Sequence, residues 1–274
     1  MKSGSEPDFP ERESSTGNRA LTPISGTVYL VGAGPGAPDL LTVRAARLLG
    51  EADIVFHDAL IGNGILSLAS NAELVPVGKR SGKHSTAQRF INKRLADAAR
   101  RYRTVVRLKG GDPMLFGRAH EEIAFLREQD IPVEVVPGVT AALAASAELG
   151  VSLTQRLVAR SVVFATPRTA HGAAPSGWEK AVAAADTAIL YMAAGEAASV
   201  KDALLRAGLP AETPVVAAEN VSLPERRLSK GTLRDLPALV ACAAGGPILL
   251  LLGEVFREAC ISQDFLQKMS GVRA

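Results

Sequence analysis

The stretch Val28-Tyr29-Leu30-Val31-Gly32-Ala33-Gly34-Pro35-Gly36 decides the fold of this chain. Four consecutive apolar residues, typical of a buried strand, lead directly into a loop of three glycines. A helical pattern of apolar residues follows over residues 40–49, with Asp39 close to its start. The stretch therefore predicts a strand, a tight loop and a helix in direct succession.

The same alternation continues through the first half of the chain. Strand-like runs recur at residues 54–56, 74–77, 104–108 and 133–136, and helix-compatible segments such as residues 88–100 and 119–129 separate them. Strands that alternate with helices favour a mostly parallel sheet with helices on both faces. Ligands of such sheets bind beyond the carboxyl ends of the strands, so the loops there are where chemistry is expected.

The pattern changes after Pro137-Gly138. A helix of small residues is expected over residues 140–149, and a second series of strands over residues 161–165, 187–191, 214–218 and 247–252. We therefore expect an α/β protein with two α/β domains and mostly parallel sheets. The expected division is a disordered N-terminal tail (1–25), an N-terminal domain (26–137), a C-terminal domain (138–260) and a C-terminal tail (261–274).

Composition narrows the possible partners. The aromatic side chains, eight Phe, three Tyr and one Trp, are too few for the stacking platforms that single-stranded nucleic-acid binders use. The 31 basic residues are spread among 28 acidic ones, so we expect no nucleic-acid partner. The longest aliphatic run, residues 248–252, is far below the roughly 18 residues that span a bilayer. No signal-peptide core is recognisable, so we expect a cytoplasmic protein without a membrane partner.

Neither cysteines nor histidines suggest a metal. Cys242 and Cys260 have no Cys or His at metal-ligand spacing, and we expect both to be buried thiols in a reducing compartment. His57 and His120 each stand beside an acidic residue but have no second ligand at a convincing offset. No metal site is therefore predicted.

The first glycine loop invites comparison with the dinucleotide-binding fingerprint, but the match is poor. Counted from Gly32, the third glycine of the fingerprint would fall on Ala37. Pro35 also removes a backbone donor from the supposed phosphate site. A dinucleotide-dependent dehydrogenase is therefore disfavoured.

A second glycine-rich run, Arg107-Leu108-Lys109-Gly110-Gly111-Asp112-Pro113-Met114-Leu115-Phe116-Gly117-Arg118, leaves the strand at residues 104–108. Consecutive glycines let a ligand touch the main chain. Asp112 can cap the following turn or accept a hydrogen bond from a ligand amine or hydroxyl. Gly-Gly-Asp-Pro alone is a common turn, but the basic flanks and the following Glu121-Glu122 make this run specific.

With these motifs in order, the chain resembles the tetrapyrrole (precorrin) methylase family, and within it the uroporphyrinogen-III C-methyltransferases. The resemblance covers roughly residues 27–256. Besides the two glycine-rich runs, it is carried by the segment around Asp58, by Val77-Gly78-Lys79-Arg80-Ser81-Gly82, by Val136-Pro137-Gly138-Val139-Thr140-Ala141-Ala142, by Leu153-Thr154-Gln155-Arg156 and by Tyr191-Met192.

The resemblance implies a fold of two α/β domains with the active site in the cleft between them, usually in a homodimer. It also implies methyl transfer from S-adenosylmethionine to C2 and then C7 of uroporphyrinogen III, without a metal. The products would be S-adenosylhomocysteine and precorrin-2, the precursor of sirohaem, cobalamin or haem d1. At this length a single activity is expected. By motif position, the contacts to S-adenosylmethionine fall on Pro35, Gly110, Gly111, Asp112, Leu115, Thr140, Ala141, Met192 and Val221, several of them through backbone atoms.

The resemblance also assigns catalytic positions, which fall on Asp58, Lys79, Arg118, Glu121 and Arg156. After methyl transfer a proton must leave a meso carbon, which calls for a general base, and we take Asp58 as that base. The family gives the position of Lys79 as the acid. An arginine stays protonated and its planar fork suits carboxylates, so Arg118 and Arg156 are expected to anchor the carboxylate-rich substrate.

Two other functions stay open. A ribose 2′-O-methyltransferase of rRNA is similar in fold and begins with a comparable glycine loop, but the basic residues around the second glycine run suit a compact polyanion better than an extended strand. The other alternative is a non-catalytic relative that binds S-adenosylmethionine or a tetrapyrrole. It is supported by Gln155 and Pro167, where family members usually have His and Gly. Met192, without its motif, would be expected in the core.

Overall fold

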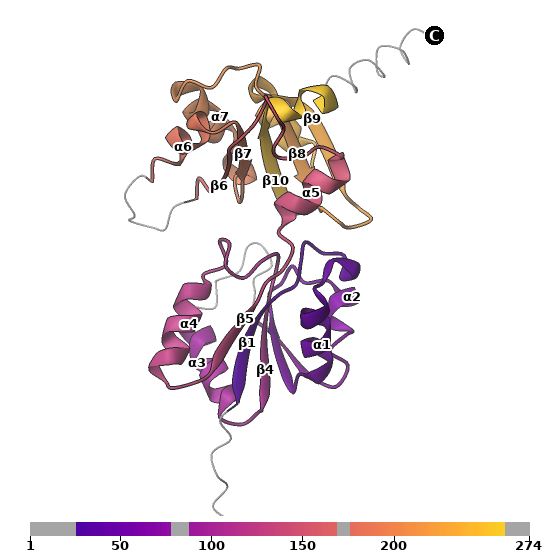
Figure 1. Ribbon diagram of the computed structural model, residues 1–274, viewed down its shortest axis with the longest axis vertical. Helices are drawn as coiled ribbons and strands as arrows, with labels where there is room; N and C mark the ends of the chain where they lie inside the picture. Colours follow the sequence, from indigo (N-terminus) through magenta and orange to yellow (C-terminus); the bar gives the residue numbers. More distant parts are fainter. Residues whose placement is uncertain (1–25, 78–87, 169–175, 261–274) are drawn as a thin grey trace, which may run out of the picture.

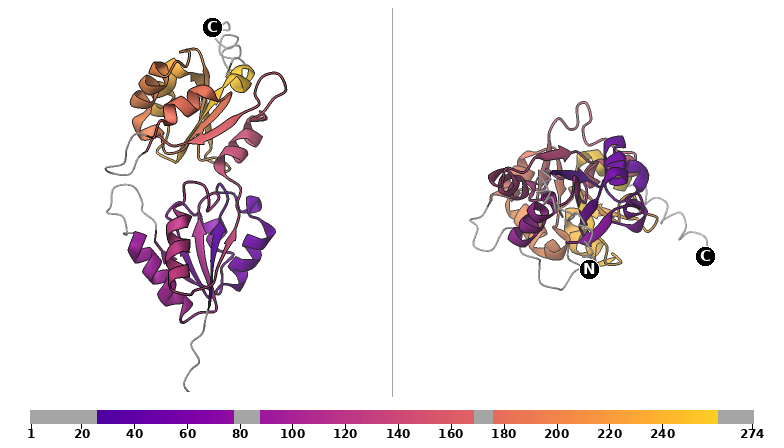
Figure 2. Two further views of the ribbon diagram at one scale, coloured as in Figure 1. Left: turned by 60° about the vertical axis from the view of Figure 1, so that its left-hand side comes forward. Right: turned by 90° about the horizontal axis from the view of Figure 1, so that it is seen from below.

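The chain forms two lobes, one built on each of two sheets (Figure 1 and Figure 2). The computed structural model describes residues 26–77, 88–168 and 176–260. The expected tails, residues 1–25 and 261–274, lie outside the described residues, and so does Lys79.

The first sheet has five strands, and all of its pairings are parallel, as the alternating pattern predicted. Its strands are β1 (Thr27–Gly32), β2 (Ile54–His57), β3 (Glu73–Pro76), β4 (Thr104–Lys109) and β5 (Val133–Val136). They lie in the order β3-β2-β4-β1-β5. The central strand β4 is flanked by β1 and β2, so the residues that follow β1, β2 and β4 lie close together at one edge of the sheet.

Helices cover both faces of the first sheet. One face packs against α1 (Val43–Glu51) and α2 (Asn63–Leu66), and the other against α3 (Gln88–Ala99) and α4 (Ala119–Glu128). Neighbouring residues of β1 are buried on opposite faces of the sheet. Leu30 packs in the core with α3 and α4, and Val31 packs in the core with α1 and α2. A strand that is buried on both faces is a continuous apolar run in the sequence, which is why residues 28–31 predicted a strand.

The helix expected at residues 40–49 begins later than predicted. Pro38–Leu40 forms a separate 3-10 turn. The α-helix then begins after Thr42, whose hydroxyl accepts a hydrogen bond from the Ala45 N–H at 3.1 Å. A threonine in this N-cap position stabilises the helix start.

The second sheet corrects the prediction of mostly parallel pairing in this half of the chain. Its order is β6-β7-β10-β8-β9, and only the β6–β7 pairing is parallel. Its strands are β6 (Val162–Ala165), β7 (Thr187–Leu190), β8 (Pro214–Glu219), β9 (Arg227–Thr232) and β10 (Ile248–Gly253). An apolar run is compatible with either direction, and the short connection between β8 and β9 suits antiparallel neighbours.

The strand β9 was not predicted at all. It reads Arg-Leu-Ser-Lys-Gly-Thr, and it lies at the edge of the sheet with side chains that are exposed or half-buried. The apolar period that identifies buried strands is therefore absent from it. The remaining helices are α5 (Ala141–Leu149), α6 (Trp178–Ala184), α7 (Ala197–Arg206) and α8 (Leu236–Ala241).

The helix α5 belongs to the second lobe. Its buried residues, Ala142, Ala144 and Ala145, pack with Ile189 and Leu251 on one face of the second sheet, and α6, α7 and α8 pack on the other face. The chain thus leaves the first sheet at the end of β5 and enters the second lobe through this helix (Figure 1).

Cys242 follows α8 and is exposed, so the expectation of a buried thiol is wrong for it, whereas Cys260 is half-buried. No helix in the described part of the chain is long and apolar enough to cross a bilayer.

Candidate functional site

Two glycine loops meet where the first sheet faces the second lobe. The loop after β1 and the loop after β4 pair through a short antiparallel bridge, in which Gly34 and Gly111 exchange hydrogen bonds of 2.8 and 3.2 Å between their N–H and C=O groups. Both glycines have positive φ angles, +69° and +66°, a conformation that disfavours other residues. The two runs that the sequence singled out therefore form one surface.

A third loop, after β5, packs against this pair without side chains between the backbones. A Cβ atom on Gly138 would lie 2.3 Å from the Gly111 carbonyl oxygen, and one on Gly32 would lie 2.6 Å from the Gly138 Cα. By contrast, a Cβ atom on Gly110 would meet nothing within 4 Å. Gly138 is thus required by packing, whereas Gly110 presents bare main chain to open space.

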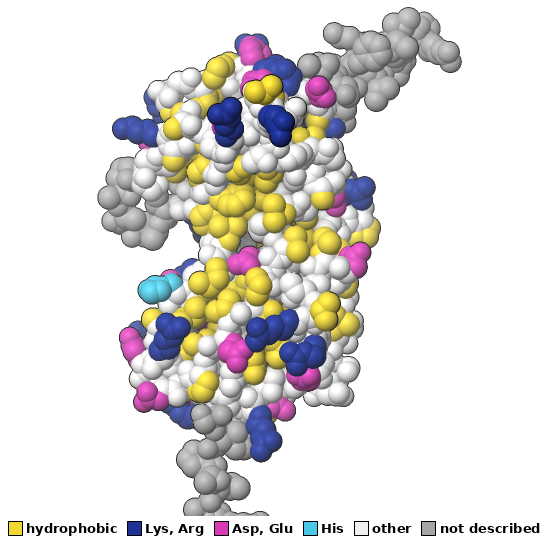
Figure 3. Space-filling view, viewed as in Figure 1, with side chains coloured by type: hydrophobic (Ala, Val, Ile, Leu, Met, Phe, Trp, Pro, Cys, Tyr) yellow, Lys and Arg dark blue, Asp and Glu magenta, His cyan; other side chains and the backbone are white. Residues whose placement is uncertain are grey.

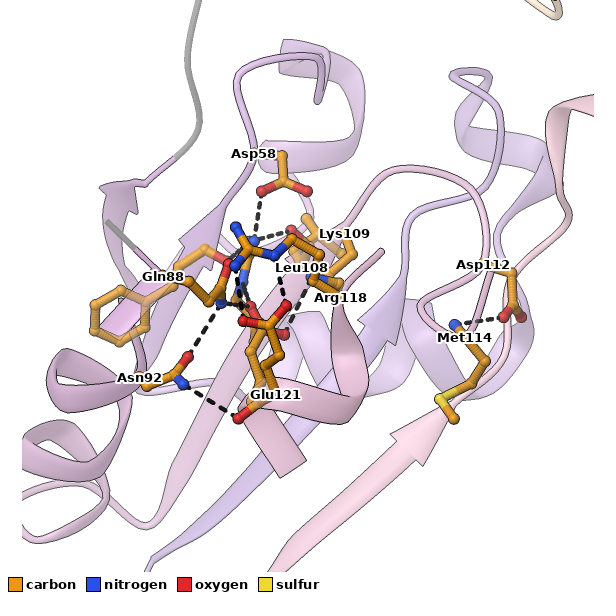
Figure 4. Close-up of polar contacts among 12 residues, drawn as sticks. Asp58, Gln88, Asn92, Leu108, Lys109, Asp112, Met114, Arg118 and Glu121 are labelled. Carbon is orange, nitrogen blue, oxygen red and sulfur yellow. Dashed lines mark hydrogen bonds and ion pairs between the residues drawn. The ribbon is translucent and has the colours of Figure 1, made fainter. Parts of the chain in front are cut away.

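Asp112 fastens these loops together. Its Oδ1 accepts a hydrogen bond from the Met114 N–H at 2.8 Å, and its Oδ2 accepts one from the Gly138 N–H at 2.9 Å. Figure 4 shows the bond to Met114. The sequence left two roles open for Asp112, capping of the turn or contact with a ligand. In the structure Asp112 caps the turn, and it also links this loop to the connection between the lobes.

The second lobe contributes the beginning of α5 and the end of β7. Thr140 precedes α5, and its hydroxyl is 2.5 Å from the hydroxyl of Tyr191, which also accepts a bond from the Ala142 N–H at 3.3 Å. Burial raises the pKa of Tyr191. The ring of Phe116, from the second glycine run, lies 5.2 Å from the Tyr191 ring, so aromatic contact joins the lobes.

Met192 lies outside the core. The residue is 48% exposed and its φ angle is +55°, a left-handed conformation unusual for a residue with a side chain. The alternative expectation of a core methionine is therefore wrong. The role of Met192 in S-adenosylmethionine binding, which the motif implies, remains a prediction.

Pro35 and Val221 lie on loops that also contact each other across the lobes. The Ala37 N–H donates to the hydroxyl of Ser222 at 2.9 Å. The Ser222 N–H in turn donates to Glu148 of α5 at 2.9 Å. Val221 itself is buried in the core of the second lobe.

Asp58 lies at the end of β2 beside a buried group of charges. Its Oδ1 accepts a hydrogen bond from Arg107 Nη2 at 2.6 Å. Arg107 Nε and Lys109 Nζ each donate to the fully buried Glu122 at 3.1 Å. Burial, and then the charge of Arg107, lower the pKa of Lys109. Figure 4 shows Asp58 at one end of this group.

Arg118 and Glu121 form an exposed pair at the beginning of α4. Both guanidinium contacts, from Nε and Nη2, are 2.7 Å long. The hydrogen bond raises the pKa of Arg118 and lowers that of Glu121. Arg118 has a φ angle of +56°, a left-handed conformation, and the Arg118 and Glu121 side chains are 58% and 48% exposed.

The remaining predicted residues are not brought together with these. Arg156 lies on an exposed loop, closed by the bonds between Gln155 and Ala159, that projects from the second lobe (Figure 2). Within the described ranges, no hydrogen bond or ion pair links Arg156 to the other predicted site residues. Lys79 lies outside those ranges. The space-filling view shows apolar side chains on both sides of a notch between the lobes (Figure 3).

Sequence reasoning included Arg107, Glu122 and Tyr191 in its motifs but assigned no role to any of them. Arg107 and Lys109 alternate with apolar residues in a strand that is buried on both faces, and such positions hold a charge only when it is paired. This alternation of charged and apolar residues was the signal in the sequence for a buried, paired charge. Among the described residues, no group of three or more His, Cys, Asp or Glu side chains could hold a metal ion.

Comparison with known proteins places the chain in a family. Residues 27–237 match the family described as Tetrapyrrole (Corrin/Porphyrin) Methylases. The chain is 45% identical over 233 residues to the siroheme synthase of Pseudomonas fluorescens, a match that covers 84% of this chain and 50% of that protein. It is 43% identical over 234 residues to the chloroplastic S-adenosyl-L-methionine-dependent uroporphyrinogen III methyltransferase of Arabidopsis thaliana. This match covers 84% of this chain and 63% of that protein. The chain thus spans about half the length of the siroheme synthases it matches.

A solved structure agrees in fold over nearly the whole described chain. The uroporphyrin-III C-methyl transferase of Thermus thermophilus, complexed with S-adenyl homocysteine, is 39% identical. Its TM-score is 0.74, and the match covers 85% of this chain and 94% of that one. The glycine loops, the two-lobed α/β fold and these matches together show that the chain belongs to the tetrapyrrole methylases.

Proposed function

We propose that this chain is an S-adenosylmethionine-dependent C-methyltransferase that converts uroporphyrinogen III to precorrin-2 by methylation at C2 and C7. The observation that carries the proposal is the backbone surface formed by Gly34, Gly110 and Gly111 in the paired loops after β1 and β4. The relatives named above support it, because one of them methylates uroporphyrinogen III and another is complexed with S-adenyl homocysteine. The division near residue 137 is part of the proposal, since β5 ends at Val136 and α5 packs in the second lobe.

The proposed donor site suits a ligand that is held mainly by main-chain groups. When bound, S-adenosylmethionine supplies a sulfonium methyl group, which is already a strong electrophile. The residues around the loops would hold it through backbone N–H and C=O groups, and the exposed Met192 is proposed to join them. The proposed residues are Pro35, Gly110, Gly111, Asp112, Leu115, Thr140, Ala141, Met192 and Val221.

The proposed acceptor side supplies positioning and a base. A reduced pyrrole carbon is an enamine-like nucleophile, so alignment of the two reactants can supply much of the rate enhancement. Asp58 Oδ2 has no hydrogen-bond partner among the described residues, and the side chain is 32% exposed, so this oxygen can accept the proton that leaves the meso carbon. Arg118 would bind substrate carboxylates, and Glu121, Arg156 and Lys79 complete the proposed set.

We also propose a homodimer in a reducing compartment such as the cytoplasm. The resemblance to the family supports the dimer, and two free cysteines support the compartment. Sedimentation velocity at micromolar protein concentration tests the dimer directly.

Incubation with S-adenosylmethionine and anaerobically prepared uroporphyrinogen III tests the proposed activity. We expect a mass gain of two methyl groups in the tetrapyrrole. Binding of S-adenosylhomocysteine without any mass gain would favour the non-catalytic relative. Methylation of rRNA in place of the tetrapyrrole would favour the ribose methyltransferase.

A further inference from the structure

Glu122 is a fully buried carboxylate that accepts three hydrogen bonds. Oε1 accepts from Arg107 Nε at 3.1 Å and from Gln88 Nε2 at 3.0 Å, and Oε2 accepts from Lys109 Nζ at 3.1 Å. The exposed fraction of the Glu122 residue is 0%. A carboxylate of this kind is costly to bury unless it is fully paired, so it fixes the donors around it.

Arg107 has little capacity left for a ligand. Its Nε donates to Glu122, its Nη1 to the carbonyl oxygens of Leu108 and Phe56 at 3.1 and 3.5 Å, and its Nη2 to Asp58 at 2.6 Å. These contacts use four of the five donors that a guanidinium has. Arg107 is also only 3% exposed, so it differs from Arg118, which is open to the solvent.

The contacts end at Asp58, whose side chain is 32% exposed, whereas Glu122 is fully buried. Asp58 is tied at the backbone by its N–H, which donates to the Leu108 carbonyl at 3.3 Å, and at the side chain by Arg107. The group carries two positive and two negative charges when Asp58 is ionised: Arg107 and Lys109 against Glu122 and Asp58. The position of Asp58 Oδ1 therefore depends on an arginine whose own orientation is set by Glu122.

We propose that Glu122 is a positioning residue for methyl transfer, which acts through Arg107 to fix the orientation of the Asp58 carboxylate. This inference rests on the proposed function, because it takes Asp58 as the base. Burial and the neighbouring Arg107 lower the pKa of Lys109, which agrees with a tightly packed group in which Glu122 is the shared anion.

Glu122→Gln alone leaves two buried cations against one anion and can prevent folding. The test therefore uses the double variant Glu122→Gln/Lys109→Met, which removes one charge of each sign, in the wild-type background and with Asp58→Asn. Glu128→Gln, an exposed change on the same helix, is the matched control.

We expect the double variant to bind S-adenosylhomocysteine within about twofold of wild type and to lose at least about tenfold in kcat. With Asp58→Asn already present, the same two changes should lower the residual kcat by less than about twofold, because Glu122 acts through Asp58. A full tenfold loss in both backgrounds, or an unchanged kcat in the wild-type background, would overturn the proposal.

A readout without turnover separates this inference from the proposed function. In protein labelled with ¹⁵N-arginine, the Arg107 Nε–H resonance, assigned by its loss in Arg107→Lys, should exchange slowly with water in the wild type and fast in the double variant. Slow exchange in both would refute the positioning by Glu122 even if uroporphyrinogen III is methylated. If the wild type methylates no tetrapyrrole, the proposed function fails, and the catalytic role of Glu122 fails with it.

Discussion

The Asp112 carboxylate accepts a hydrogen bond from the Gly138 N–H at 2.9 Å, and this bond ties the second glycine loop to the connection between the lobes. Twenty-six positions separate the two residues, yet Gly138 also touches Gly32 and Gly111 through its backbone. A side chain proposed to contact the ligand thus also links the loop after β4 to the loop after β5.

Asp112→Ala should weaken binding of the cofactor. Bonds to a carboxylate contribute about 1.5–3 kcal/mol each, so losing the loop register should raise the Kd for S-adenosylhomocysteine about tenfold to a hundredfold. Isothermal titration calorimetry measures this Kd. Asp97→Ala, which removes an exposed carboxylate paired with Arg100, should leave it unchanged. Equal affinities of the two variants would contradict the assignment.

Gly110→Ala and Gly138→Ala should separate a ligand-facing glycine from a packing glycine. The Gly138 variant forces a Cβ to within 2.3 Å of the Gly111 oxygen, and overpacking costs about 1–3 kcal/mol or more, so its melting temperature should fall. The Gly110 variant has open space and should melt like the wild type but bind S-adenosylhomocysteine more weakly. Unchanged binding in Gly110→Ala would show that the ligand does not approach this loop.

Arg118→Ala should weaken binding of the tetrapyrrole more than binding of the cofactor. A bidentate contact with a carboxylate is worth about 1.5–3 kcal/mol, so the KM for uroporphyrinogen III should rise about tenfold or more. The exposed pair with Glu121 contributes less than about 1 kcal/mol to stability. Arg257→Ala breaks the same kind of pair with Glu254 in the second lobe and serves as control. Equal losses of tetrapyrrole and cofactor binding would mean that Arg118 shapes the donor loop instead.

Glu219→Gln should lower stability in a pH-dependent way. The Ala244 and Gly246 N–H groups donate to the Glu219 carboxylate at 3.0 and 2.7 Å and lower its pKa. The unfolded chain therefore binds this proton more readily than the native one, so the stabilisation is complete above about pH 4.3 and is lost as the pH falls through the folded pKa. Urea unfolding should show a deficit of about 1–3 kcal/mol at pH 7 that narrows below pH 4. A constant deficit across this range would contradict the role of the charge.

Much of the first lobe could be predicted from the sequence, and less of the second. Apolar runs buried on both faces, such as residues 28–31, identify their strands without knowledge of the partners. The edge strand Arg227–Thr232 has no such run, and pairing direction is not encoded in hydrophobicity. Both the strand and the antiparallel pairings therefore had to come from the structure.

Part of the candidate site could likewise be predicted from the sequence, and part could not. The two glycine runs were recognisable because backbone surfaces need small residues, and the structure brings them together at Gly34 and Gly111. The partnership of Arg107 with Glu122 depends on β4 packing against α4, a relation between distant segments that a motif does not record. Arg156 lies on a projecting loop, and its assigned role remains a prediction.

One measurement tests the central proposal most directly. The protein is incubated anaerobically with uroporphyrinogen III and S-adenosylmethionine carrying a ¹³C-methyl group, and the tetrapyrrole product is examined by ¹³C NMR beside the Asp58→Asn variant. We predict that the wild type places the label on carbon at C2 and C7 and that the variant does so at least about a hundredfold more slowly, as expected when a general base is lost. A tetrapyrrole without label, in a protein that binds S-adenosylhomocysteine, would contradict the proposed function.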